Sequence, residues 1–152
     1  MLKGIDEANR EDVYRLLQCL VVSIRPLHVE ELVEVLAIDF DNTEGIPKMN
    51  PDWRWEDQGQ RLRAACSSLI AIVNTGYSRV VQSSHFSVQE FLTLDRLADS
   101  SEDVSRYYVS LEPAHLILVQ ACLGVLLRLD DGADVDVADE NSRNEDSPHD
   151  LL

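Results

Sequence analysis

Residues 70–82, with the sequence IAIVNTGYSRVVQ, decide the fold of this chain of 152 residues. Apolar residues lie on both sides of the turn-forming sequence Asn74-Thr75-Gly76-Tyr77-Ser78, a pattern that predicts two antiparallel strands joined by a tight turn. Three segments with helical periodicity come before this hairpin. Three helices closed by a two-stranded hairpin are the order of a winged helix, and residues 70–83 would form its wing.

The first predicted helix spans residues 10–24, where six apolar residues recur with the spacing of one helical stripe. Asn9 is positioned to cap its start, and Pro26 disfavours helix at the residue before it. Residues 29–36 repeat this spacing and predict a second helix that packs on the first through a tight corner. A third helix is predicted over about residues 57–69.

Residues 39–59 are predicted to form a long connecting loop, because they are rich in glycine, proline and asparagine and have no helical period. Trp53 and Trp55 lie in this loop, two residues apart. An aromatic pair in a loop can be a ligand platform, but large rings more often pack against the core. We therefore expect both tryptophans to clamp the loop onto the domain.

The sequence HFSVQEFL, which begins at residue 85, predicts a fourth helix that starts at Ser87. Ser87 and Glu90 have the spacing of a capping box, in which each side chain accepts a hydrogen bond from the other residue's backbone amide. Phe86 and Phe91 have the spacing of a hydrophobic staple, which sets the angle at which the chain enters the helix. His85 is thereby held at a defined place between the wing and the helix.

The longest apolar stretch predicts a C-terminal helix from Pro113 to about Leu129. Its apolar residues fall on two stripes, and the second stripe consists of Leu116, Val119, Leu123 and Leu127. A helix that is apolar on nearly all sides is normally buried on all sides, and this chain has little left to cover the second stripe. We therefore expect a protein partner to dock on Leu116, Leu123 and Leu127.

The expected fold class is mainly α: a winged-helix-like three-helix unit with a small β-hairpin wing, further helices and a disordered acidic tail. The winged-helix unit would span residues 1–98 and the C-terminal helical extension residues 99–129. Within the extension, residues 100–110 fit either a helix or a strand. Residues 130–152 would be the tail, because residues 130–150 hold nine acidic side chains and one basic one, and such blocks repel themselves.

Charge argues against a nucleic-acid partner, since 28 acidic and 13 basic residues give a net charge of −15. A winged helix can place its third helix in the major groove, but this segment offers only Arg61 and Arg63. Two cations cannot supply the roughly six to ten phosphate contacts of a tight binder. A winged-helix DNA-binding protein is nevertheless the alternative function.

The cellular setting is expected to be cytoplasmic. The first fifteen residues lack the continuous apolar segment of a signal peptide. No membrane span is expected, because residues 114–129 are only 16 in number and include three polar side chains. The three cysteines lie far apart in apolar stretches and are expected to be buried, reduced thiols: Cys19, Cys66 and Cys122.

Motifs for catalysis are missing, and we expect no enzyme, cofactor or metal site in this chain. No glycine-rich phosphate-binding motif is present, so the chain cannot be a self-sufficient NTPase. Ser83 or Ser84 with His85 and Asp95 would make a hydrolytic triad only on paper, since no G-x-S-x-G elbow exists. The acidic tail approaches an EF-hand register but has Asp139 where the loop needs glycine.

Five segments of the sequence stand out, in this order: NREDVYRLLQCLVVSIRPLHVEELVEVLAI (9–38), NPDWRW (50–55), ACSSLIAI (65–72), HFSVQEFL (85–92) and ACLGVLL (121–127). Together they resemble the winged-helix and helical segment that follows the NACHT module in fungal STAND NTPases. The segment is also known as the GPI inositol-deacylase-type winged helix domain, and it usually lies between a NACHT domain and ankyrin or other repeats. The resemblance covers about residues 9–129 and does not imply deacylase activity.

The resemblance implies a regulatory signalling segment that holds an NTPase closed until a ligand arrives. In related NACHT receptors the histidine before a similar helix contacts the β-phosphate of bound ADP, and His85 matches that position. A histidine that only ties the wing to the helix by hydrogen bonds is the structural alternative. The NACHT partner would be supplied in cis or in trans. A degenerate fragment without independent function stays a further alternative, because Ser83 and Ser84 and the acidic tail depart from the family pattern.

Overall fold

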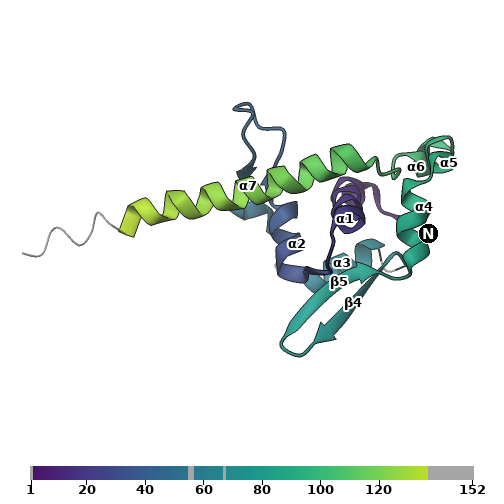
Figure 1. Ribbon diagram of the computed structural model, residues 1–152, viewed down its shortest axis with the longest axis horizontal. Helices are drawn as coiled ribbons and strands as arrows, with labels where there is room; N and C mark the ends of the chain where they lie inside the picture. The colour runs from purple at the N-terminus through teal and green to yellow at the C-terminus, as the bar shows by residue number, and fades with distance from the viewer. Residues whose placement is uncertain (1, 55–56, 67, 137–152) are drawn as a thin grey trace, which may run out of the picture.

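The structure, a computed structural model, describes residues 2–54, 57–66 and 68–136 (Figure 1). Three helices, α1 (Arg10–Val22), α2 (Val29–Leu36) and α3 (Gln58–Cys66), come before a hairpin of β4 (Ile70–Thr75) and β5 (Ser78–Ser83). The mainly α, winged-helix class predicted from the sequence is confirmed by this order. Gly76 has a φ of 65° in the hairpin turn, a conformation that residues with a Cβ rarely adopt.

Helix α1 buries the apolar stripe that the sequence shows, with Val13, Leu16 and Leu17 in the core. It ends at Val22, two residues before the predicted end, and Ile24 is fully exposed in the turn that follows. The Ser23 hydroxyl closes the last turn by donating to the Cys19 carbonyl at 2.6 Å. At the other end Asn9 makes no side-chain capping bond, so the predicted cap is wrong. The 3-10 helices η1 (Leu2–Gly4) and η2 (Glu7–Asn9) precede α1.

A third strand, β1 (Leu27–His28), joins the wing to form an antiparallel sheet in the order β1-β5-β4. Leu27 pairs with Val81, so the turn after α1 is attached to the central strand of the sheet. The sequence did not reveal this strand, because two residues are too few to show an alternating pattern.

The predicted long loop contains a small hairpin of β2 (Ile38–Asp39) and β3 (Lys48–Met49), followed by the 3-10 helix η3 (Pro51–Trp53). The prediction of an irregular segment over residues 39–59 is therefore wrong in this part. Ile38 and Met49 are buried and anchor the hairpin, whereas Trp53 is 48% exposed. The prediction that Trp53 packs on the core and holds the loop there is wrong. The β2–β3 pairing, with Ile38 and Met49 buried, attaches the loop to the core instead. Trp55 lies outside the described residues.

The chain after the wing forms α4 (Phe86–Thr93), α5 (Asp95–Ala98), α6 (Glu102–Ser105) and α7 (Leu111–Asp136). The ambiguous residues 100–110 thus hold one short helix and an irregular stretch in which Tyr107 and Val109 are buried. The Val109 amide donates to the Leu92 carbonyl at 2.8 Å, which ties this stretch to α4.

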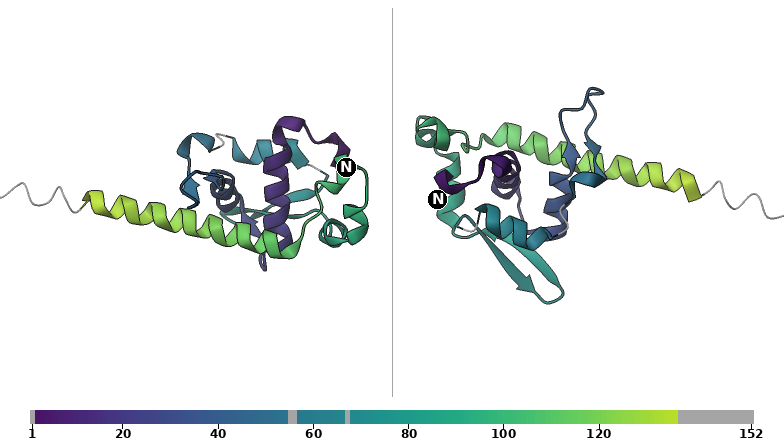
Figure 2. Two further views of the ribbon diagram at one scale, coloured as in Figure 1. Left: turned by 90° about the horizontal axis from the view of Figure 1, so that it is seen from above. Right: turned by 180° about the vertical axis from the view of Figure 1, so that it is seen from behind.

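Helix α7 lies across α1 and α2 as a lid on the domain, and its C-terminal half projects away from the body (Figures 1 and 2). It begins two residues before Pro113 and continues seven residues beyond Leu129. Disorder was therefore the wrong prediction for residues 130–136. A helix that is already nucleated by packing adds each further residue at little cost, even where the side chains are acidic. Residues 137–152 lie outside the described part.

Small residues on α7 let it approach its neighbours closely. Ala114 and Ala121 are buried, and a Cβ added at Gly124 would lie 2.8 Å from Ile38 Cδ1 and 3.3 Å from the Pro47 carbonyl oxygen. The β2–β3 hairpin therefore packs against the backbone of α7 itself. This contact explains why a glycine occupies the middle of a long helix, where it costs about 1 kcal/mol relative to alanine.

The three cysteines do not share one environment. Cys19 and Cys66 are buried free thiols, as expected, and burial raises the pKa of each to about 12. These two thiols stay protonated and unreactive at neutral pH. Cys122 is exposed on α7, so the prediction of burial is wrong for it.

A charge-assisted hydrogen-bond network closes the turn between α1 and α2. Arg25 donates to both carboxylate oxygens of Glu31, at 2.6 and 3.0 Å, and the His28 amide donates to the same carboxylate at 2.8 Å. Glu31 thus caps the start of α2 while it fixes the turn. The hydrogen bond from Arg25 is the main reason why the pKa of the Glu31 carboxyl lies below its usual value.

The contact at Gly124 yields a stability prediction. Gly124→Leu should lower the free energy of unfolding by about 1–3 kcal/mol in urea denaturation, because the side chain must displace Ile38 or the Pro47 backbone. Leucine has a higher helix propensity than glycine, so helix propensity alone predicts that the substitution raises the free energy of unfolding. Cys122→Leu, at an exposed position of the same helix, serves as the control and should change stability by less than about 0.5 kcal/mol. Equal losses in the two variants would contradict the explanation.

The Glu31 network predicts a pH dependence. Because the folded pKa of Glu31 is lowered, the carboxylate stabilises the fold above the unfolded pKa, and this contribution is lost as the pH falls through the folded value. Both side chains are partly exposed, so Glu31→Gln should cost only about 0.5–1 kcal/mol at pH 7. The difference from the wild type should shrink towards pH 3 in thermal or urea unfolding. Glu44→Gln, in the exposed loop, is the control; a pH-independent difference at Glu31 would rule out the mechanism.

Candidate functional site: the wing–helix corner and the outer face of α7

His85 lies at the corner where β5 ends and α4 begins. Its Nδ1 accepts a hydrogen bond from the Ser87 amide at 3.2 Å and lies 2.8 Å from the Ser87 hydroxyl oxygen. A backbone amide can only donate, so Nδ1 carries no proton in the neutral ring and the proton resides on Nε2. The side chain is exposed. His85 therefore presents an outward N–H donor whose orientation is fixed by the capping bond.

The helix start differs from the prediction. α4 begins at Phe86, and His85 rather than Ser87 is the N-cap, so the predicted capping box between Ser87 and Glu90 is wrong. Sheet pairing continues one residue past the wing, because the Ser84 amide donates to the Leu69 carbonyl at 2.9 Å. This pairing leaves only His85 between sheet and helix, and its imidazole nitrogen takes the place of a serine hydroxyl.

The two phenylalanines do not form the predicted staple. Phe86 is 68% exposed and contacts the His85 ring, with the ring centroids 4.3 Å apart. Phe91 is also exposed, as is Leu94 just after α4. Since the helix starts one residue early, Phe86 occupies its first turn and cannot pack back from a preceding position. The corner instead carries His85 beside exposed apolar side chains.

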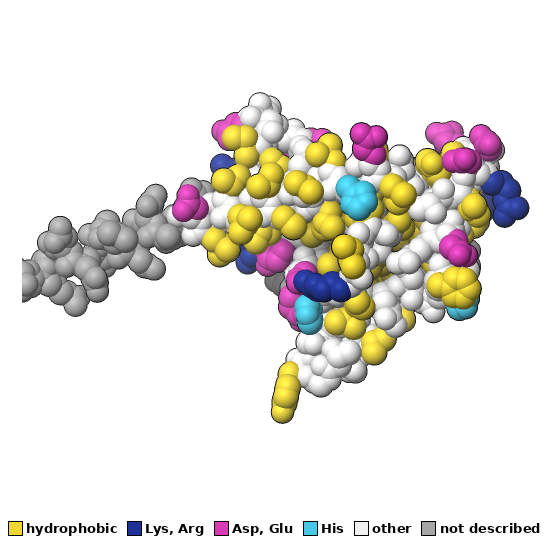
Figure 3. All heavy atoms as spheres, viewed as in Figure 1, with side chains coloured by type: hydrophobic (Ala, Val, Ile, Leu, Met, Phe, Trp, Pro, Cys, Tyr) yellow, Lys and Arg dark blue, Asp and Glu magenta, His cyan; other side chains and the backbone are white. Residues whose placement is uncertain are grey.

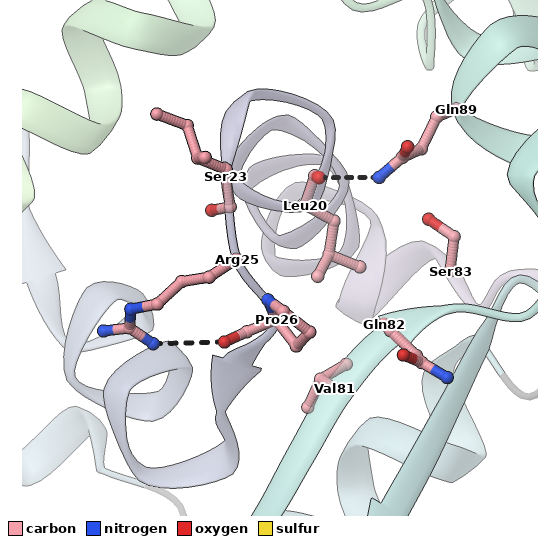
Figure 4. A pocket seen from close by; sticks show the side chains of 9 residues that line it. Leu20, Ser23, Arg25, Pro26, Val81, Gln82, Ser83 and Gln89 are labelled. Atoms are coloured by element: carbon pink, nitrogen blue, oxygen red, sulfur yellow. Dashed lines mark hydrogen bonds between the residues drawn. The ribbon is translucent and has the colours of Figure 1, made fainter.

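Gln89 holds α4 against α1, a role that the sequence did not reveal. Its Nε2 donates to the Leu20 carbonyl at 3.0 Å, in the last turn of α1 (Figure 4). Val88 and Leu92 are buried on the same side of α4. The exposed donor of His85 is therefore mounted on a helix that is fixed to the core by both apolar packing and a hydrogen bond.

A pocket of about 210 Å³ lies between the end of α1, the turn to β1, strand β5 and helix α4 (Figure 4). Its lining includes Ser23, Arg25, Gln82 and Gln89, but not His85. The guanidinium of Arg25 is already bound to Glu31. Small-molecule sites are typically about 300–1,000 Å³, so this pocket is too small to enclose a nucleotide. A phosphate at His85 would have to be held mainly by another surface.

Five apolar side chains form a second exposed feature, which we name the outer face of α7. They are between 47% and 60% exposed and comprise Leu116, Val119, Leu123, Leu126 and Leu127. The buried residues Ala114, Ala121 and Gly124 lie on the other side of the helix. Figure 3 shows apolar side chains along the length of α7. The structure thus places all three predicted docking leucines on one uncovered face.

The length and composition of Leu111–Asp130 alone would allow it to cross a membrane, with 17% of that window buried in the domain. The predicted helix was shorter, and so no membrane span was expected from the sequence. One side of α7 packs on α1 and α2.

The remaining candidate chemistry is not assembled at this corner. Asp95 accepts a hydrogen bond from the Tyr108 hydroxyl at 3.4 Å, and Nδ1 of His85 is engaged by Ser87, so neither serves a triad. On α3, Arg63 is exposed, while the side chain of Arg61 lies outside the description. In the described ranges no group of three His, Cys, Asp or Glu residues is placed to hold a metal ion.

The geometry of His85 predicts its tautomer. In long-range ¹⁵N imidazole spectra at about pH 8.5, where an ordinary imidazole is neutral, His85 should show the Nε2-protonated pattern. His115, an exposed histidine on α7, provides the control and should show a mixture of both tautomers. A dominant Nδ1-protonated form of His85 would exclude the capping bond and the outward donor together.

Comparison with known proteins agrees with the fold. Residues 2–104 match the family described as "GPI inositol-deacylase, winged helix domain". The "Azaphilone pigments biosynthesis cluster protein L" of Monascus ruber is 33% identical over 131 residues, which are 84% of this chain and 26% of that protein. The chain spans about a quarter of the length of this relative. No solved structure matches this chain. The family match covers most of the chain, and the structure has the three helices and the wing; this protein belongs to the GPI inositol-deacylase winged helix domain family.

Proposed function

We propose that this chain is a non-catalytic regulatory segment of a NACHT-type STAND NTPase. The NTPase module would lie elsewhere in the same protein or in a separate chain. The observation that supports the proposal most directly is the exposed Nε2–H of His85, held at the wing–helix corner by its capping bond to Ser87. Such a donor binds an anion without any change of its own hydrogen bonds.

A nucleotide phosphate is the anion that fits this role. The first amides of α4 and the Nε2–H of His85 lie at the same end of the helix, where the helix dipole is positive. The pocket near Arg25 is too small to enclose a nucleotide, so the partner module would hold the base and sugar. His85 would then contact the phosphate at the edge and thereby report whether ADP is bound.

The side chains around His85 suit a protein contact. Phe86, Phe91 and Leu94 are exposed next to it, and apolar side chains of this size contribute most of the binding energy when a partner covers them. Closure of a module over this corner would bury them and bring a bound phosphate to His85. The same closure would explain how such a segment keeps an NTPase inactive.

A second contact would involve the C-terminal helix. We propose that a protein partner docks on Leu116, Leu123 and Leu127 of the outer face of α7, while nucleic acid and membranes are not partners. The acidic surface, with a net charge of −15, disfavours phosphate backbones and anionic lipids. A cytoplasmic setting fits this proposal, because Cys19, Cys66 and Cys122 are all free thiols.

The proposal predicts slower nucleotide exchange in the partner module. A NACHT module loaded with a fluorescent ADP should release it more slowly in the presence of this chain, and His85→Gln should remove about tenfold or more of that effect. The estimate follows from one hydrogen bond to a charged group, worth roughly 1.5–3 kcal/mol. His115→Gln is the matched control, because it changes an exposed histidine far from the corner and should have no effect.

Three results would count against the proposal. These are an unchanged exchange rate with the wild-type chain, an unchanged effect of His85→Gln, and micromolar binding of ADP by the isolated chain. The DNA-binding alternative is tested by measuring whether the isolated wild-type chain is retained on duplex DNA at low salt. Retention that weakens steeply with salt would favour that alternative.

A further inference from the structure

The outer face of α7 has the repeat of a helix–helix seam. Leu116, Val119, Leu123 and Leu126 follow the spacing 3, 4, 3, which is the a and d pattern of a heptad, and Leu127 lies beside them. These positions are separated by about 17 Å along the helix from Leu116 to Leu127, or about three turns. The matching surface of a partner is therefore another helix of at least three turns with an apolar stripe.

Charge at the borders of this face limits which helix can bind. Glu112 and Asp130 are exposed one turn beyond each end of the leucine row, and the helix continues through three further aspartates. Arg128 is the one lysine or arginine of α7, and its guanidinium contacts Met49 Sδ on the hairpin side of the helix. The described part of the outer face thus carries acidic groups at both ends and no lysine or arginine.

A second copy of this chain is a poor match for such a face. In an antiparallel pair Glu112 of each copy would lie near Asp130 of the other, and in a parallel pair each acid would lie near its own equivalent. Like charges at such contacts are destabilising in either orientation. An anionic membrane surface would be repelled for the same reason.

We propose that the outer face of α7 binds an amphipathic helix whose apolar stripe is flanked by lysine or arginine. This inference rests on the docking part of the proposed function and names the chemistry of the partner; it does not depend on nucleotide sensing by His85. Burial of five apolar side chains supplies affinity, and the acidic groups at both ends of the face favour basic partners.

The probe is a synthetic peptide of about 16 residues with leucines at a and d and lysines beside them. A matched peptide has glutamate in place of every lysine, and a third has the lysine peptide's composition in scrambled order. Binding of each to the full chain is measured by fluorescence anisotropy. We expect micromolar binding of the lysine peptide, at least tenfold weaker binding of the other two, and several-fold weakening as salt rises from 50 to 500 mM.

Variants on α7 locate the site. The triple variant Leu116→Gln, Leu123→Gln and Leu127→Gln should weaken binding of the lysine peptide at least tenfold, because it removes the seam and keeps every charge. Leu129→Gln is the matched control: it is an exposed leucine of the same helix that is not one of the five residues of the outer face, and the variant should bind as the wild type does. Circular dichroism checks that the helix content is kept. If the triple variant loses structure, Leu123→Gln alone should still weaken binding several-fold.

Other occupants of the face would be revealed directly. Equal binding of the lysine and glutamate peptides would overturn the selection by charge. Loss of binding in Leu129→Gln would overturn the assignment of the site to the outer face of α7. If light scattering shows a dimer for the wild-type chain and a monomer for the triple variant, the face binds a second copy. Binding to phosphatidylcholine vesicles that the triple variant abolishes would assign it to lipid. His85→Gln should leave peptide binding unchanged, so failure here is distinguishable from failure of nucleotide sensing.

Discussion

The packing of α7 across α1 is the contact on which the rest of the structure depends. It is possible because Ala114, Ala121 and Gly124 present almost no side chain where the helices and the β2–β3 hairpin meet. Close approach excludes water from the leucines of α1 and gives the domain one continuous core. The same geometry leaves the opposite side of α7 uncovered, so the stability of the domain and the exposure of the outer face of α7 have one origin.

The wing–helix corner shows how sheet pairing decides a functional geometry. The Ser84 amide pairs with Leu69, which extends the sheet until only His85 separates it from α4. The imidazole must then cap the helix, and this bond directs its other nitrogen outwards. Gln89 fixes α4 to the end of α1, so the corner cannot rotate freely. A histidine in a mobile loop would not hold a donor in one direction.

The two exposed features lie on different elements and suit different partners. The corner offers one polar donor among exposed aromatic side chains, which fits contact with a module that carries its own anion. The outer face of α7 offers a row of leucines with acidic ends, which fits a basic amphipathic helix.

The extents of α2 and of the wing could be predicted without the structure, because helical spacing and a turn flanked by apolar residues are local patterns. The same spacing indicated that Leu116, Leu123 and Leu127 of α7 would lack cover, but it did not indicate that Leu126 is exposed as well. Three features could not be predicted in this way: His85 replaces Ser87 as the cap, Trp53 is half-exposed, and α7 extends to Asp136. Strand β1 and the hydrogen bond from Gln89 to α1 were likewise not predictable from the sequence. Each depends on a contact between segments that are distant in the chain, and a local pattern does not record such contacts.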